Sequence, residues 1–193
     1  MDDQLIPIVE DPYIIHENTM LITPFYTEQA YLHSHVMEVY QEIQVKENPR
    51  KIVMNSLEYF GADLLGRNQS AGGILRNQRL LPVLISERSK MCMIPTCSPT
   101  KPENCWISYR HVRSIDPKGN RSIVTLENHK RVELNITRDT LERRIEKAAR
   151  LVDTYEIRYQ KIIDLYRSQI IAESQTIYKI PSFENQDDHS FTE

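Results

Sequence analysis

The spacing of hydrophobic residues changes near Thr137, and this change restricts the fold more than any other feature of the sequence. Before Thr137, short runs of β-forming residues alternate with turn residues. In Trp106–Ile115, successive side chains are expected to alternate between two faces of a strand. After Thr137, apolar residues recur at steps of four and three from Leu141 to Tyr166, the spacing of an amphipathic helix. The sequence therefore predicts an α+β fold, a mostly antiparallel sheet with amphipathic C-terminal helices over residues 138–175.

The apolar stripe from Leu141 to Tyr166 has two interpretations. It can lie on the protein's own sheet, which is the usual role of an amphipathic helix in a globular domain. It can also form a seam with a second copy of the chain, because its spacing is close to a heptad repeat. The sequence does not choose between them.

Shorter elements are expected before the stripe. One helix is predicted near residues 50–60, with Gly61 as its C-cap. Residues 13–26 are predicted to form a hairpin with Glu17-Asn18 between its strands. Asp116-Pro117-Lys118-Gly119 has the composition of a turn. The other predicted strands are residues 80–85, 91–95, 106–115, 121–126 and 131–136.

Four of the five glycines, Gly61, Gly66, Gly72 and Gly73, fall within thirteen residues. This density predicts a flexible or tightly turned loop. The segment Gly61-x4-Gly66-Arg67-Asn68 has the glycine spacing of a P-loop. It lacks the phosphate-binding lysine and the magnesium-binding hydroxyl, and a P-loop follows a strand rather than a helix. We therefore do not expect nucleoside triphosphate binding.

Length and composition favour one α+β domain over residues 1–175 and an acidic, flexible tail over residues 176–193. A chain of 193 residues can bury a core without a metal or a disulfide. No segment approaches the roughly 18 apolar residues of a membrane span, and the acidic first residues are unlike a signal peptide. The three cysteines fit reduced thiols. A cytoplasmic protein without membrane association is expected.

The net charge of −3 conceals an uneven distribution. Residues 1–49 contain one base and nine acids, and residues 151–193 contain four bases and eight acids. The centre, residues 50–150, contains nineteen bases and ten acids, so it carries a net charge of +9 between two acidic ends. A basic centre of this kind suits a polyanion such as nucleic acid, although a solvated cationic sheet face would give the same pattern.

The sequence offers little catalytic or metal chemistry. Cys92, Cys97, Cys105 and His111 are potential zinc ligands, but they are separated by four, seven and five residues rather than paired as in structural zinc sites. No nucleophile–base or paired-carboxylate signature is present. We therefore expect no metal, no cofactor and no enzymatic activity, although catalytic residues can also assemble only in the folded chain.

Arginine and lysine side chains of the basic centre are the candidate DNA-binding residues. Arginine grips phosphate with a planar fork and can enter a narrow minor groove. No helix-turn-helix, zinc finger or RNP pattern is present, so a major-groove recognition helix is not indicated. The candidates are Arg67, Arg76, Arg79, Lys101, Arg110, Arg113, Lys118 and Arg121.

Several short motifs follow one another in a characteristic order between about Tyr13 and Arg150. The motifs are Asn55–Gly61 with Gly66-Arg67, Pro82–Ile85, Ile94-Pro95-Thr96 with Ser98, Trp106-Ile107-Ser108 with His111-Val112, and Val132–Thr137. The sequence they form resembles the competence transcription factor (ComK) family of Gram-positive bacteria. It departs from that family where Asn68 replaces a second basic residue and where Leu81 replaces the first proline of a pair.

The resemblance implies a transcriptional activator of competence (DNA-uptake) genes, acting at the nucleoid. It implies binding to paired A/T-rich boxes of double-stranded DNA, mainly through minor-groove shape and phosphate contacts, as a homodimer or homotetramer. It also implies control through an adaptor of a Clp protease, for which Ile177–Pro181 is a candidate element. The alternative is a regulatory protein-interaction module of the same fold that does not bind DNA.

Overall fold

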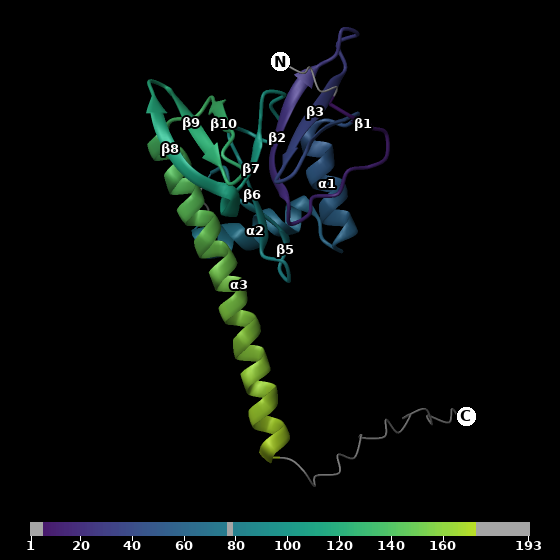
Figure 1. Ribbon diagram of the computed structural model, residues 1–193. Helices are drawn as coiled ribbons and strands as arrows, with labels where there is room; N and C mark the ends of the chain where they lie inside the picture. The colour runs from purple at the N-terminus through teal and green to yellow at the C-terminus, as the bar shows by residue number, and fades with distance from the viewer. Residues whose placement is uncertain (1–5, 77–78, 173–193) are drawn as a thin grey trace, which may run out of the picture. The chain divides into compact units, whose positions relative to one another are not determined.

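Seven strands form one mostly antiparallel sheet in a computed structural model that describes residues 6–76 and 79–172 (Figure 1). Only the pairing of β1 with β4 is parallel among these strands. The predicted α+β class is therefore confirmed. In spatial order the strands are β1 (Ile8–Val9), β4 (Glu42–Val45), β3 (Leu32–Glu38), β2 (Thr19–Tyr26), β7 (Trp106–Ser108), β6 (Met91–Pro95) and β5 (Val83–Ser86).

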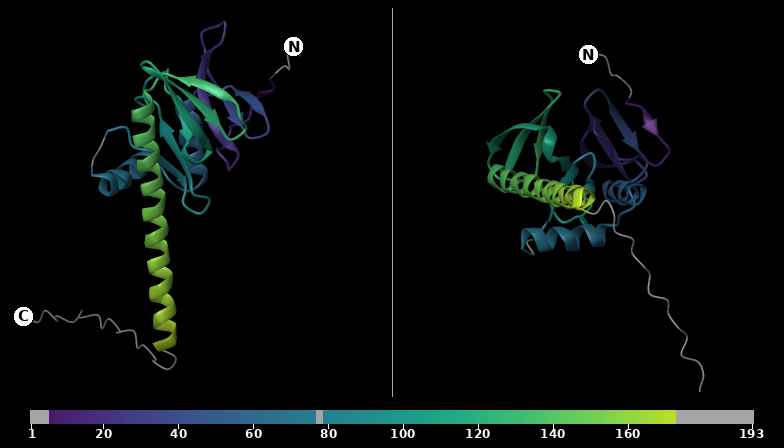
Figure 2. Two further views of the ribbon diagram at one scale, coloured as in Figure 1. Left: turned by 60° about the vertical axis from the view of Figure 1, so that its left-hand side comes forward. Right: turned by 90° about the horizontal axis from the view of Figure 1, so that it is seen from below.

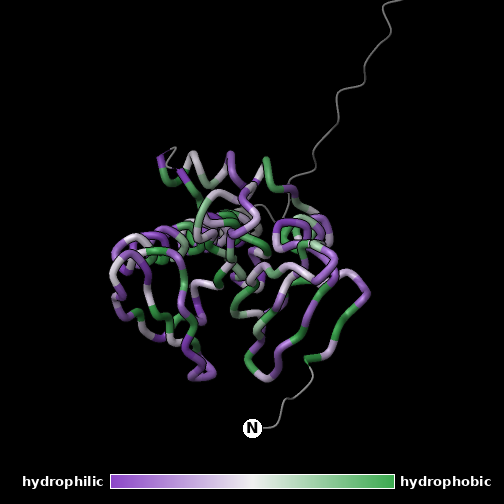
Figure 3. The backbone as a smooth tube through the Cα atoms, turned by 90° about the horizontal axis from the view of Figure 1, so that it is seen from above, coloured by the Kyte–Doolittle hydropathy of each residue, from purple (hydrophilic) through white to green (hydrophobic). Residues whose placement is uncertain are grey.

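The centre of this sheet is buried on both faces. Successive residues of its strands alternate between two hydrophobic cores, so that Trp106 belongs to one core and Ile107 to the other. In Figure 3, hydrophobic residues are seen in the packed centre of the backbone trace. Strand β6 is buried along its whole length, as expected for a strand that packs on both sides.

Helix α1 (Pro49–Tyr59) covers one face (Figure 2). Asn48 caps its N-terminus by accepting a hydrogen bond from the Lys51 N–H at 2.9 Å, and Pro49 occupies the first turn. Ile52, Val53 and Leu57 of this helix pack in the core that contains Trp106. Gly61, with φ +71°, follows the helix end, so the helix predicted near residues 50–60 is confirmed.

The other face is covered by two helices and a second sheet. The second sheet is antiparallel, in the order β10 (Arg131–Leu134), β9 (Arg121–Leu126) and β8 (Val112–Lys118). Its inward residues belong to the same hydrophobic core as residues of helix α2 (Leu64–Leu75) and of the first half of helix α3 (Arg138–Ala172). This core contains Leu75, Val124, Leu126, Leu134, Leu141 and Ala148.

The loop predicted between Gly61 and Gly73 is wrong, because α2 occupies most of this segment. Asp63 caps the helix by accepting a hydrogen bond from the Gly66 N–H at 2.9 Å. Arg76 ends it in the left-handed conformation. Burial of Ala71 and Leu75 against the second core stabilises the helix despite its glycines. Tertiary packing therefore overrides the low helix propensity of this segment.

The hairpin predicted over residues 13–26 is also wrong, because only its second half, β2, is a strand. The preceding residues lie against α1 instead, where the Ile15 N–H donates a hydrogen bond to Ser56 Oγ at 2.9 Å. Strand β2 instead pairs with β3 on one side and with β7 on the other.

The single strand predicted over residues 106–115 is divided by a 3-10 turn, Tyr109–His111. The His111 ring is buried and its Nδ1 lies 2.9 Å from Ser108 Oγ, which ties the turn to the end of β7. Through this turn the chain leaves the seven-stranded sheet and enters the three-stranded sheet. The residues predicted as the following turn, Asp116 to Lys118, belong to β8, and the chain reverses at residues 119–120.

The amphipathic helical segment predicted at the C-terminus is one continuous helix, α3, rather than more than one. The chain divides into two compact units inside α3, after Ile157. No helix within the described ranges has a stretch both long and apolar enough to cross a bilayer. The predicted tail and the candidate adaptor element Ile177–Pro181 lie outside the described residues.

A buried polar network fixes the start of β2. The Tyr13 hydroxyl donates to Glu38 Oε1 at 2.8 Å and lies 2.6 Å from Thr19 Oγ1. Burial of Glu38 opposes its ionisation. Hydrogen bonds from Gln41, Tyr13 and His16 outweigh that effect and hold the pKa of Glu38 below its ordinary value.

Substitution Gly73→Ala tests whether residues 64–75 are helical. Gly73 is exposed within α2, and a Cβ there meets no atom within 4 Å. Because alanine favours a helix, the free energy of unfolding should rise by about 0.5–1 kcal/mol, measured by urea denaturation. Gly61→Ala is the matched control and should be destabilising, because Gly61 has a positive φ. A loss of stability in Gly73→Ala would contradict the helix.

Substitution Tyr13→Phe tests the Glu38 network. At pH 7 it should lower the free energy of unfolding by about 1–2 kcal/mol, because a buried carboxylate loses a donor. The folded-state pKa of Glu38 is lowered. Its contribution is therefore complete above the unfolded pKa and is lost as pH falls through the folded pKa. The difference between wild type and variant should shrink on acidification. Exposed Tyr40→Phe is the control and should change little.

Candidate nucleic-acid interface

The tip of the β8–β9 hairpin brings together two of the predicted cations. Lys118 and Arg121 are directly opposite each other in the register, on either side of the turn. Both are ion-paired with Glu133 of β10, and the Arg121 Nη1 atom lies 3.0 Å from Glu133 Oε1. Arg131 on β10 lies 3.2 Å from Asp116 on β8. The exposed face of the second sheet thus carries an ion-pair network of three bases and two acids.

The cations of this ion-pair network are accessible to solvent. The side chains of Lys118 and Arg121 are 55% and 60% exposed. A hydrogen bond from Lys118 and, as the next largest effect, one from Arg121 lower the pKa of Glu133, so this carboxylate stays ionised. Exposed ion pairs contribute little stability, and a phosphate oxygen can therefore replace Glu133 as a partner of either cation.

A second group lies at the other end of β8. Arg110, His111, Val112, Arg113 and Glu127 line a shallow pocket of about 280 Å³. The Arg110 guanidinium donates to the Ser89 carbonyl at 3.1 Å, and Arg113 Nη1 lies 3.0 Å from the His129 ring. Burial lowers the pKa of His111, partly offset by Glu127. The neutral histidine leaves the two arginines as the cations of this pocket.

Arg67 is held inside the protein rather than displayed on a loop. It projects from α2, and its side chain is 14% exposed. Its Nη1 atom lies 2.6 Å from Glu87 Oε1, and its guanidinium carbon lies 5.9 Å from the centre of the Tyr155 ring. These contacts tie α2 to the β5–β6 turn and to α3. The geometry gives Arg67 a structural role, whatever it does in binding.

The remaining candidates are dispersed. Lys101 lies on the segment between β6 and β7, with its Nζ atom 3.4 Å from Glu103 Oε1. Arg76 ends α2 and is exposed, and Arg79 is exposed beyond the undescribed residues 77–78. The structure thus joins Lys118 with Arg121 and Arg110 with Arg113, and it does not bring all eight candidates into one site. Their role in DNA binding stays a prediction.

The candidates predicted from the sequence did not include Arg131, which belongs to the ion-pair network of the second sheet. The signal was available, because alternation along residues 131–134 places Arg131 and Glu133 on one face of a strand. The pairing with Asp116 was hidden, since Asp116 was assigned to a turn instead of to β8.

The cysteines do not form a metal centre in the part of the chain that the structure describes. No group of three or more His, Cys, Asp or Glu residues there could hold a metal ion. Cys92 is fully buried, and burial raises its pKa. Burial also raises the pKa of Cys105 to about 11. These side chains are neutral thiols at physiological pH. The P-loop-like segment likewise follows helix α1 rather than a strand.

Comparison with known proteins adds evidence on the family to which the chain belongs. A family model described as ComK protein matches residues 10–160. The competence transcription factor of Bacillus subtilis (strain 168) is 27% identical to this chain over 115 residues. The match covers 59% of this chain and 60% of that relative's length. No solved structure matches.

A double-mutant cycle tests the structural role of Arg67. Arg67→Ala should lower the free energy of unfolding by about 1 kcal/mol, because it removes an ion pair and a cation–π contact. Glu87→Ala should remove only the ion pair. The coupling energy between the two substitutions should be about 0.5–1 kcal/mol by urea denaturation. Strictly additive effects would show that the Arg67–Glu87 pair is energetically silent.

Proposed function

Because the chain belongs to the ComK family, we propose that it is a DNA-binding transcriptional activator of competence (DNA-uptake) genes. The observation that carries this proposal is the family match over residues 10–160, which spans strands β2 to β10 and both cation groups at the two ends of β8. The named relative is a competence transcription factor. Its activity is extended to this chain as part of the proposal. A transcription factor would act in the cytoplasm, at the nucleoid, and would not be an enzyme.

We propose that the exposed face of β8–β10 approaches the DNA backbone. Lys118, Arg121 and Arg131 supply positive charge along this face, and each can exchange a carboxylate for a phosphate. Such contacts position a protein on the duplex without reading base edges. Preference for A/T-rich boxes would then come from the narrow minor groove, whose negative potential attracts arginine. Arg121 at the hairpin tip is the candidate for insertion into this groove.

Paired boxes would require two binding domains, as in a homodimer or homotetramer. The helical stripe supports this part of the proposal. Its first residues, including Leu141, Ala148 and Val152, are buried in the protein's own core. In the second unit, Tyr159, Ile162 and Tyr166 are exposed. The same exposed residues favour the second candidate function, a regulatory module that binds a protein through α3 and does not bind DNA.

Fluorescence anisotropy with labelled duplexes separates the two functions. The full chain should bind an A/T-box duplex more tightly than a G/C duplex of equal length. Lys118→Ala and Arg121→Ala should each weaken binding and reduce the slope of log K against log [salt] by about 0.9, because each removes one phosphate contact.

Lys161→Ala is the control, because this exposed lysine lies just beyond the family match. It should leave the slope unchanged. Equal affinity for both duplexes would favour the protein-interaction module. If the chain binds the A/T-box duplex but both hairpin variants keep the wild-type salt slope, the chain binds DNA and the hairpin tip is not part of the interface.

A further inference from the structure

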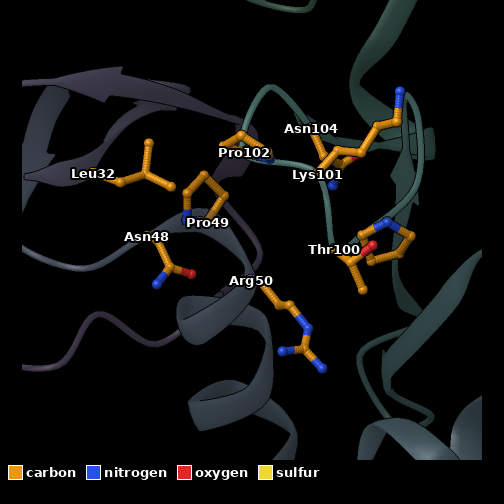
Figure 4. Close-up of a pocket in the computed structure, with 9 residues that line it drawn as sticks. Leu32, Asn48, Pro49, Arg50, Thr100, Lys101, Pro102 and Asn104 are labelled. Atoms are coloured by element: carbon orange, nitrogen blue, oxygen red, sulfur yellow. The ribbon is translucent and has the colours of Figure 1, made fainter.

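A pocket of about 230 Å³ lies between the N-terminus of α1 and the segment that joins β6 to β7 (Figure 4). Asn48, Pro49 and Arg50 form one wall, and Thr100, Lys101 and Asn104 belong to the opposite wall. This pocket is separate from the cation groups of β8–β10. Only Lys101 among its residues was a candidate from sequence.

Asn104 gives the pocket an unusual property. Asn104 is 2% exposed, and its Oδ1 atom accepts a hydrogen bond from the Cys97 N–H at 3.0 Å. This bond fixes the orientation of the amide, because only the oxygen can accept. The Nδ2 donor is buried and has no hydrogen-bond partner within the described residues. Buried donors in proteins are nearly always paired, so this unpaired donor of a pocket-lining residue is available to an acceptor from outside the chain.

The first turn of α1 supplies a second donor on the opposite wall. Lys51 N–H is bonded to the Asn48 side chain and Ile52 N–H to the Asn48 carbonyl, while Pro49 has no N–H. The Arg50 N–H is left without a hydrogen-bond partner among residues 6–76 and 79–172. A helix N-terminus with a free N–H attracts anions, since the helix dipole places partial positive charge there.

Two long cationic side chains flank the same pocket. Arg50 is exposed and has no ion pair or hydrogen bond in the described ranges. Lys101 is 59% exposed, with Glu103 as its partner at 3.4 Å. Figure 4 shows the two side chains leaving opposite walls of the pocket and extending outward. An anion in the pocket would therefore meet donors at its walls and exposed positive charge at its edge.

We propose that this pocket binds a phosphate group of the nucleic-acid backbone. Donors from opposite walls suit a tetrahedral group, whose oxygens point in several directions, better than a planar carboxylate. Arg50 acts through its N–H and its guanidinium, Lys101 through its charge, and Asn104 through Nδ2. The inference rests on the proposed DNA-binding function and adds a contact outside the β8–β10 face.

Salt titration of binding to the A/T-box duplex tests this site in the full chain. Arg50→Gln should weaken binding several-fold at low salt and reduce the slope of log K against log [salt] by about 0.9. Asn104→Asp keeps the acceptor for Cys97 N–H and replaces the orphaned donor by a carboxylate oxygen. It should weaken binding by about tenfold or more, because the new charge repels phosphate.

Arg88→Gln is the matched control. Arg88 is an exposed arginine of the β5–β6 turn that does not line the pocket, and its substitution should leave the slope unchanged. Thermal unfolding reports whether Asn104→Asp is folded, and Arg50→Gln tests the site independently because its side chain has no partner to lose. Wild-type affinity and slope in Arg50→Gln would overturn the site and leave the proposed function intact.

A second arm distinguishes the source of the phosphate. Wild-type chain that binds neither duplex would overturn both the proposed function and a nucleic-acid phosphate in this pocket. In that case, inorganic phosphate that raises the melting temperature of wild type but not of Arg50→Gln would assign the pocket to free phosphate. Binding to DNA that is weakened in both pocket variants, with Arg88→Gln unaffected, is the result expected from the proposal.

Discussion

Two-sided burial of the central sheet is the constraint on which the rest of the structure depends. Trp106 and Ile107 are adjacent, fully buried and directed into different cores. A strand of this kind needs a cover on each side, since neither set of side chains can face water. Helix α1 covers one face, and α2, α3 and the second sheet cover the other. Polar hairpin tips and loops are left for the periphery, which is where the accessible cations lie.

The sequence predicted those elements whose hydrophobic pattern is decided locally. Helix α1 has a cap residue, a proline in its first turn and apolar residues on one face, and β6 and β9 lie where predicted. The errors occurred where distant contacts override local preference. Helix α2 contains three glycines and exists because Ala71 and Leu75 pack on the second core. The division of the strand after Ser108 depends on burial of His111, which alternation alone does not reveal.

The sequence predicts the excess of positive charge at the candidate site, but it does not predict which of the basic side chains lie together on the surface. Counting bases identified the centre of the chain, yet it could not separate Arg67, held against Glu87 and Tyr155, from Arg121 on an open hairpin. The distinction depends on burial and on partners from remote segments. Arg50 is not predictable from the sequence for the same reason, because its position opposite Asn104 arises only when the β6–β7 segment folds over the start of α1.

The shared carboxylate of Glu133 has a consequence for selectivity. By holding Lys118 and Arg121 together, it acts as a tethered competitor that any incoming anion must displace. Isolated small ions in solution compete poorly with a tethered group, whereas a polymer presents many phosphates at once. If this face binds anions, as proposed, the hairpin would favour extended polyanions over dissolved metabolites, with its two cations already held side by side by Glu133.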